Sequence, residues 1–268
     1  MKKLMKNEFT EIEVISSLDS SCEKNLFFFP DVYEEQNVPL VVGLHTWSFD
    51  RFNMVEIIEL CKERNWALLL PEFRGPNLIK NPRAKEACGS QLACQDIIDA
   101  TEFVQANYSI DKDAVFLVGG SGGGHMSLMT SAYKPEMWHG VSSWCPITDI
   151  ALWHQYYGSG KGYAPHIEKC CGGAPGDSPE VDYEYSKRSP MSYLTKLAKV
   201  NLSVHHGRFD ISVPCIHTIN LAIALNTLEP KNFFFEILDG GHDFEPKRAF
   251  AWFDKLMNTI GDATTLTD

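Results

Sequence analysis

Residues 114–126 read Ala-Val-Phe-Leu-Val-Gly-Gly-Ser-Gly-Gly-Gly-His-Met. The first five are apolar, which indicates a buried strand, and a helical pattern begins at Met126. Ser121 and its glycines match the Gly-X-Ser-X-Gly pattern of a nucleophile elbow, a sharp strand-to-helix turn that exposes a serine hydroxyl. A plain glycine-rich turn is the alternative. The strand–turn–helix context favours the elbow, because strand and helix pass close together there and leave no room for Cβ atoms.

Alternating strands and helices surround this turn. A hairpin is predicted over residues 11–30. Further strands are predicted at 39–45, 66–71, 114–119, 140–146, 201–207 and 232–238. Helices are predicted at 54–64, 91–108, 191–199, 216–228 and 246–260. This alternation predicts an α/β fold with a mostly parallel, doubly wound sheet and helices on both faces.

Residues 147–189 interrupt the alternation. They have weak periodicity and many aromatic, glycine and proline residues. The segment is too long for an ordinary loop, so a lid or cap insertion is expected there. No linker or repeat divides the chain, and we expect one domain over residues 1–268.

The chain has 268 residues and a formal net charge of -11. Such acidity argues against a nucleic acid or an anionic membrane as partner, because phosphate binding needs clustered Lys and Arg. The N-terminus is basic but lacks the apolar segment of a signal peptide, and eight cysteines are scattered through the chain. We therefore expect a cytoplasmic protein with reduced thiols. The pair Cys170-Cys171 lacks metal-ligand spacing, and no metal or organic cofactor is implied.

Reactive side chains follow three of the predicted strands. Ser121, Asp210 and His242 occur in the chain order of the α/β-hydrolase triad, at strand ends where such sheets form their sites. A serine needs a base to take its proton, imidazole titrates near neutrality, and a buried carboxylate fixes the imidazole. Asp239 and Asp149 are alternative acids. His205 and His206 end a strand, where a packing or capping role is expected.

The oxyanion hole needs two N–H donors. Gly122, which follows the serine, supplies one. The second is expected after the strand at 39–45, where we favour the backbone of Trp47, with Thr46 as the alternative. Trp47 could instead cover the core.

Several motifs together resemble the α/β-hydrolase superfamily, in particular the catalytic domain of the prolyl oligopeptidase type and its single-domain esterase relatives. The matching pieces are Leu44–Trp47, Phe73–Gly75, Asp96, Gly119–Gly124, Cys145–Asp149, Arg188–Pro190, His206–Pro214 and Gly240–Phe244. The resemblance implies that Ser121 is the nucleophile, Asp210 the acid and His242 the base. It also implies a structural role for Arg74, paired with a carboxylate such as Asp96.

The resemblance further implies that Trp144 and the 147–189 segment line an acyl or leaving-group pocket. The predicted substrate-binding residues are His45, Trp144, Trp153, Tyr156 and Tyr157. The aromatic side chains of the insertion could stack on a sugar, line an apolar acyl pocket, or form local core.

A serine hydrolase acting on a short-chain acyl or sugar ester through an acyl-enzyme is the favoured function. Only a short hairpin precedes the predicted core, with no propeller domain and no recognisable acidic anchor for a peptide N-terminus, which favours an ester. A small peptidase or amidase is the alternative, and a non-catalytic binding protein on the same fold is a third hypothesis. The expected partner is a small ester or a short peptide, and a homo-oligomer stays open.

Overall fold

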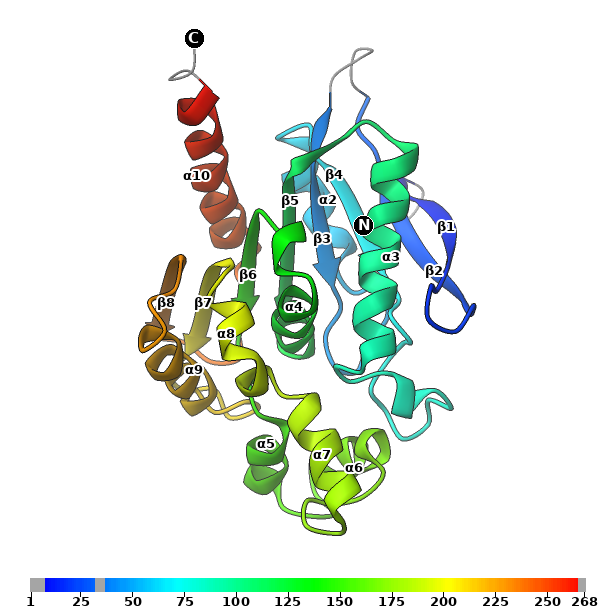
Figure 1. Cartoon of the computed structure of the whole chain (residues 1–268), viewed down its shortest axis with the longest axis vertical. Helices are drawn as coiled ribbons and strands as arrows, with labels where there is room; N and C mark the ends of the chain where they lie inside the picture. Colours follow the sequence, from blue (N-terminus) through cyan, green and yellow to red (C-terminus); the bar gives the residue numbers. More distant parts are fainter. Residues whose placement is uncertain (1–7, 32–36, 265–268) are drawn as a thin grey trace.

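The computed structural model describes residues 8–31 and 37–264. In this part of the chain, eight strands form one sheet in the order β1-β2-β4-β3-β5-β6-β7-β8 (Figure 1). The strands are β1 (Thr10–Ile15), β2 (Cys22–Phe28), β3 (Val38–Leu44), β4 (Ala67–Pro71), β5 (Ile110–Gly120), β6 (Gly140–Trp144), β7 (Asn201–Gly207) and β8 (Asn232–Leu238). β1 and β2 pair antiparallel, β2 is antiparallel to β4, and all other neighbours are parallel. The predicted doubly wound sheet and its hairpin are confirmed.

Helices cover both faces of the sheet (Figure 1). They are α2 (Ile58–Lys62), α3 (Gln91–Asn107), α4 (Gly122–Tyr133), α5 (Ile150–Tyr157), α6 (Ala164–Cys171), α7 (Pro179–Lys187), α8 (Leu194–Leu197), α9 (Ile216–Asn226) and α10 (Pro246–Thr264). Because strand side chains alternate, Leu40 and Val42 of β3 pack on the face covered by α3 and α4, while Val41 packs on the face covered by α2 and α10. The sheet is therefore buried on both sides, as apolar parallel strands require.

The helix predicted from residue 54 is shorter than expected. Val55–Ile57 forms a 3-10 turn, and the α-helix begins only at Ile58. Met54 is the N-cap residue of this turn, and its side chain makes no capping hydrogen bond. Without a polar cap the first N–H groups lack an acceptor, and the tighter 3-10 geometry takes over the first turn.

The segment 147–189 contains three short helices where the sequence shows little periodicity. Local capping residues begin and end them: Asp149 caps α5, Ser178 caps α7, and Gly172 ends α6 in the left-handed conformation. Each helix buries only a few side chains. The helices share a separate apolar cluster with Trp47 of the loop after β3, rather than joining the two cores of the sheet.

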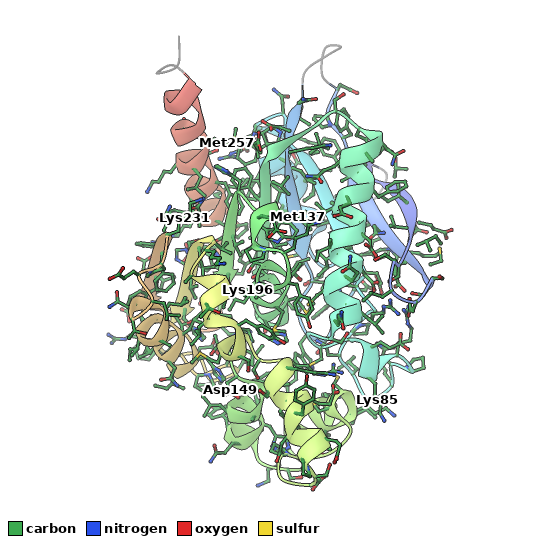
Figure 2. All side chains as sticks on the ribbon, viewed as in Figure 1. Lys85, Met137, Asp149, Lys196, Lys231 and Met257 are labelled. Atoms are coloured by element: carbon green, nitrogen blue, oxygen red, sulfur yellow. The ribbon has the colours of Figure 1, made fainter. Side chains whose placement is uncertain are left out.

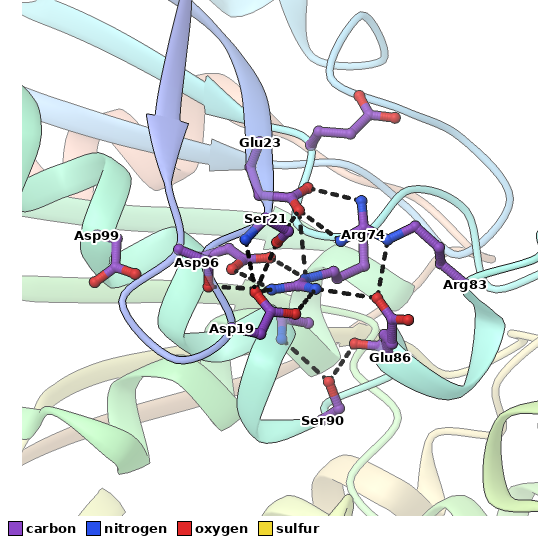
Figure 3. A network of polar contacts seen from close by, with 12 residues as sticks. Asp19, Ser21, Glu23, Arg74, Arg83, Glu86, Ser90, Asp96 and Asp99 are labelled. Carbon is purple, nitrogen blue, oxygen red and sulfur yellow. Dashed lines mark hydrogen bonds and ion pairs between the residues drawn. The ribbon is translucent and has the colours of Figure 1, made fainter.

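A buried arginine joins the hairpin to the sheet (Figure 3). The guanidinium of Arg74 is fully buried and makes two hydrogen bonds to Asp96 of α3, at 2.5 Å and 2.9 Å. It also contacts Asp19 at 2.7 Å and Glu86 at 3.0 Å. The Arg74–Asp96 pair is thus present in the structure. It fixes the β1–β2 turn against α3, on the side of the sheet away from β8.

No helix within residues 8–31 and 37–264 is long and apolar enough to cross a membrane. All eight cysteines lie in these residues and are free thiols. The basic N-terminal start noted in the sequence lies almost entirely outside the described residues.

Candidate active site

Ser121 stands at the junction of β5 and α4. Its φ of 55° and ψ of -120° are outside the regions that a residue with a side chain normally adopts. Two hydrogen bonds hold the junction: Ser121 N–H donates to the carbonyl of Trp144 at 2.8 Å, and His125 N–H donates to the carbonyl of Ser121 at 2.9 Å. The strained backbone is therefore fixed by its neighbours, which is the arrangement of a nucleophile elbow.

The glycines beside the serine are required by close backbone contacts. A Cβ atom on Gly119 would lie 2.4 Å from the carbonyl carbon of Gly123, and one on Gly123 would lie 2.3 Å from the carbonyl oxygen of Leu44. Real Cβ atoms do not approach so closely. The strand and the helix can meet at Ser121 only because both positions lack a side chain.

Two backbone N–H groups lie next to the elbow. A Cβ atom on Gly122 would lie 2.4 Å from the backbone nitrogen of Trp47, so the two residues are in close contact. Gly122 is the first residue of α4, and its N–H has no acceptor within the helix. The N–H of Thr46 donates to Asn53 Oδ1 at 3.0 Å, whereas the N–H of Trp47 forms no hydrogen bond within the described residues. This geometry favours Trp47 over Thr46 as the second donor.

Asp210 and His242 form a short hydrogen bond. His242 Nδ1 lies 2.5 Å from Asp210 Oδ2, and the side chain of His242 is 30% exposed while that of Asp210 is fully buried. The other oxygen of Asp210 accepts the N–H groups of Ser212 at 2.8 Å and Val213 at 2.9 Å. Burial alone would raise the pKa of Asp210, but the hydrogen bonds from His206, His242 and the backbone outweigh it and hold that pKa well below its usual range. The carboxylate is therefore ionised and can orient the imidazole.

The loop that carries His242 packs on the elbow. A Cβ atom on Gly120, the residue before Ser121, would lie 3.2 Å from Cβ of Phe244. Cys145, just after β6, donates its thiol to the carbonyl of Asp243 at 3.3 Å. The close approach of Phe244 to Gly120 and the hydrogen bond from Cys145 to Asp243 thus keep residues 242–244 near the end of β5, where Ser121 lies.

His206 is a partner of Asp210 that the sequence did not single out for the site. Its Nε2 lies 3.2 Å from Asp210 Oδ2 and 2.7 Å from the carbonyl of Val213, and its Nδ1 lies 2.8 Å from Thr218 Oγ1. The ring is completely buried. One signal was available in the sequence: His206 lies near the end of the strand that Asp210 follows, four residues before it. The sequence predicts a packing or capping role for it, and the pattern alone does not reveal the contact.

The alternative acids have other partners. Asp239 forms an exposed ion pair with Arg208 at 3.0 Å, and Asp149 accepts the N–H groups of Ala151 and Leu152 as the cap of α5. Neither contacts His242 in the described residues, so Asp210 is the carboxylate that the structure brings to this histidine.

Two of the predicted substrate-binding residues lie in the interior. His45 is 2% exposed, stacks on Phe73 and places its ring nitrogens 2.9 Å and 3.0 Å from two backbone carbonyls. Trp144 is completely buried, stacks on His205 at 4.1 Å and packs under α10. Their rings contact other side chains rather than an open surface.

The aromatic side chains of α5 contact the loop that holds Asp210. Trp153, which is buried, and Tyr157 both donate to the carbonyl of Ser212 at 2.8 Å. Tyr156, which is 49% exposed, donates to the carbonyl of Ile211 at 2.9 Å. These three residues of the insertion therefore hold in place the loop that carries Asp210, which we name the acid loop.

Among residues 8–31 and 37–264, one group has donor atoms close enough to hold a metal ion: Cys145, His206 and Asp210, with donor atoms within 4.8 Å of one another. Their chemistry does not fit an ion. Both nitrogens of His206 already have partners, and burial raises the pKa of the Cys145 thiol to about 12, so it stays protonated.

The fold and this geometry define an α/β-hydrolase. Residues 85–259 match the model of the prolyl oligopeptidase family, and the chain belongs to that family. No curated protein matches the chain.

Solved structures with the same fold include an acylaminoacyl peptidase from Pyrococcus horikoshii, with 18% identity and a TM-score of 0.69 over 88% of this chain. A puromycin-hydrolyzing peptidase from Mycobacterium tuberculosis has 16% identity and a TM-score of 0.74 over 92% of this chain. This chain covers only 38% of either peptidase. An S-formylglutathione hydrolase from Staphylococcus aureus has 14% identity and a TM-score of 0.69, and the match covers 91% of this chain and 98% of that enzyme.

Proposed function

We propose that this protein is a serine hydrolase that cleaves carboxylic esters through an acyl-enzyme on Ser121. The observation that carries the proposal is the Asp210–His242 hydrogen bond of 2.5 Å, in a loop packed against the serine elbow. A buried ionised carboxylate keeps the proton on Nδ1 of His242, which leaves Nε2 free to act as a base.

In the first half of the reaction, Ser121 Oγ attacks the ester carbonyl carbon as His242 Nε2 takes its proton. The carbonyl π electrons move to oxygen, and the oxyanion accepts hydrogen bonds from the N–H groups of Gly122 and Trp47. Collapse of the tetrahedral intermediate breaks the bond to the leaving oxygen, which receives the proton from His242. The products are an alcohol and an acyl ester on Ser121.

In the second half, water replaces the alcohol. His242 removes a proton from water as it attacks the acyl carbon, and returns that proton to Ser121 Oγ when the ester bond breaks. The acid is released and the serine is regenerated. Each proton is thus moved by one histidine, whose orientation depends on Asp210.

Ester cleavage is supported by the match to the S-formylglutathione hydrolase, which this chain covers almost completely. A short-chain acyl or sugar ester is the proposed substrate. The peptidase alternative is supported by the family model and by the acylaminoacyl and puromycin-hydrolyzing peptidases. An amide demands more from His242 than an ester does, because the leaving amine must be protonated as the bond breaks.

We further propose one domain over residues 1–268 in which residues 147–189 form a lid beside the site, supported by the hydrogen bonds from α5 to the loop that carries Asp210. A cytoplasmic location is proposed as well, and the eight free cysteines support it.

The test compares wild type with Ser121→Ala on p-nitrophenyl acetate and butyrate and on a panel of aminoacyl anilides. Ester turnover that is lost in the variant, with anilides left intact, is the expected result. Anilide cleavage that depends on Ser121 would replace the ester proposal with the peptidase alternative. No turnover of any substrate, together with no labelling of Ser121 by a fluorophosphonate, would leave a binding protein on this fold.

A further inference from the structure

A cavity of about 550 Å³ lies at the end of the sheet opposite to the active site. His139 and Asn201, which line it, are at the beginnings of β6 and β7, and Lys112 is near the beginning of β5. Ser121 and Asp210, by contrast, follow the carboxyl ends of β5 and β7. A ligand in this cavity would therefore not occupy the triad. Figure 2 labels three of the lining residues, Met137, Lys196 and Lys231.

Four lysines line this space, which we name the lysine cavity: Lys112, Lys196, Lys199 and Lys231. All four are exposed, and none forms an ion pair within the described residues. Asp113 and Glu136 are its acidic side chains, so the lining carries two more positive than negative charges. A concave surface with an excess of positive charge attracts anions, and this one lies on a chain whose net charge is -11.

The residue types suit a compact, multiply charged anion. The lining contains no arginine, so it lacks the planar fork that binds carboxylates and phosphates at two points. The lysine ammonium is a compact point charge and is a common partner of phosphate. Pro135, Met137 and Trp138 give part of the wall an apolar surface. The volume is in the range of pockets that hold small organic ligands, about 300–1,000 Å³.

We infer that the lysine cavity binds a small anion that carries two or more phosphate charges, and that an organic part of such a ligand lies against Met137 and Trp138. This inference does not depend on the proposed hydrolase activity, because the cavity and the triad are at opposite ends of the strands. The ligand could be a free polyphosphate or an organic phosphate such as a nucleotide, and both share the chemistry that four lysines recognise.

Calorimetric titration of the full chain carrying Ser121→Ala tests the inference, with pyrophosphate, ATP and citrate as probes at low ionic strength. Pyrophosphate is expected to bind one to one, and to weaken as salt is raised, because exposed charges are screened. The double variant Lys196→Gln/Lys231→Gln is expected to weaken binding by about tenfold, since each exposed charge contributes modestly. Lys247→Gln is the matched control: Lys247 is an exposed lysine of α10 outside the cavity, and its loss is expected to change nothing.

The outcomes separate the possibilities. ATP binding tighter than pyrophosphate supports an organic phosphate, and equal binding supports a free polyphosphate. Citrate binding as tightly as pyrophosphate overturns the phosphate class. The site itself is overturned if no probe binds up to about 10 mM, if Lys247→Gln weakens binding as much as the double variant, or if wild type labelled at Ser121 fails to bind what the unlabelled protein binds.

Discussion

His206 and Asp210 share a buried contact: Nε2 of the histidine lies 3.2 Å from Oδ2 of the carboxylate. That oxygen is the same one that His242 Nδ1 meets at 2.5 Å. Because Nε2 of His206 also lies 2.7 Å from the carbonyl of Val213, this nitrogen carries a proton and donates it to both oxygens. Asp210 thus has a fixed second donor behind the one it shares with the proposed base.

The first prediction concerns His206 as a positioning residue. His206→Leu removes a buried donor to a charged acceptor, which typically costs about 1.5–3 kcal/mol, or roughly tenfold to a hundredfold in rate if the loss is felt in the transition state. We expect kcat on p-nitrophenyl butyrate to fall by that factor with KM little changed. His206→Gln keeps a donor and should recover part of the rate. A loss of stability with unchanged kcat would show that His206 only packs.

The contact between Gly122 and Trp47 gives the second prediction. Gly122→Ala places a methyl group where only 2.4 Å separates it from the Trp47 nitrogen, so the two proposed oxyanion donors must move apart. Loss of one such donor costs about 10²–10³ in kcat. Gly172→Ala is the matched control, because its methyl group meets open space at the end of α6, although its φ of +91° makes it a strained substitution. We expect the control to lower stability but not kcat. Equal kcat in wild type and Gly122→Ala would remove these donors from the mechanism.

Much of this architecture could be predicted from the sequence. Apolar runs mark the buried strands β3, β4 and β5, and the glycines around Ser121 indicate a close approach of strand and helix that only they permit. Strand order then places polar residues at one edge of the sheet. The apolar runs and the glycines are local features of the sequence, and each points to one kind of structure.

The remaining features depend on three-dimensional contacts. The sequence shows that His206 ends a strand, but not which carboxylate it meets. Trp144 is the last residue of a buried strand and could have faced the site, yet the pleat of β6 directs it to the core beside His205. The three helices of the insertion are too short for a clear period, and local caps decide where they begin.

The third prediction concerns Tyr157 and the acid loop. Tyr157→Phe removes one donor to the carbonyl of Ser212 but leaves the donor from Trp153 in place. We therefore expect a loss of about 1 kcal/mol in the free energy of unfolding, measured by urea titration. Tyr156→Phe is the control, since its hydrogen bond is at the surface and should contribute less. A larger effect in Tyr156→Phe than in Tyr157→Phe would contradict this account of how the loop is held.

The fourth prediction concerns the Arg74–Asp96 pair. Arg74→Ala leaves Asp96 buried without its partner, and breaking such a pair typically costs about 3–5 kcal/mol. Arg208→Ala breaks the pair with Asp239, whose side chains are 58% and 79% exposed, and should cost less than about 1 kcal/mol. Urea unfolding of both variants measures the difference. Similar losses in the two would mean that the network in Figure 3 contributes no more than a surface ion pair.

The last prediction is a loss of stability at mildly acid pH, caused by three buried histidines. Burial lowers the pKa of His125 and of His205 to about 4, and that of His217 to about 3. In the unfolded chain each titrates near 6.5, so between about pH 6.5 and pH 4 the unfolded state binds more protons than the folded state. The free energy of unfolding is therefore not reduced by these histidines above about pH 6.5, and it falls as the pH drops below that value.

In this range, each of these histidines lowers the free energy of unfolding by up to about 1.4 kcal/mol for every unit that the pH falls. The loss therefore begins at a higher pH than the one at which carboxylates are protonated. Urea unfolding at pH 7, 6 and 5 measures the slope. His205→Phe keeps a ring that can stack on Trp144 and removes one titrating group, so its stability should fall less steeply with pH than that of wild type. If wild type and His205→Phe lose stability in parallel over this range, His205 is not one of the groups that make the folded state acid-sensitive.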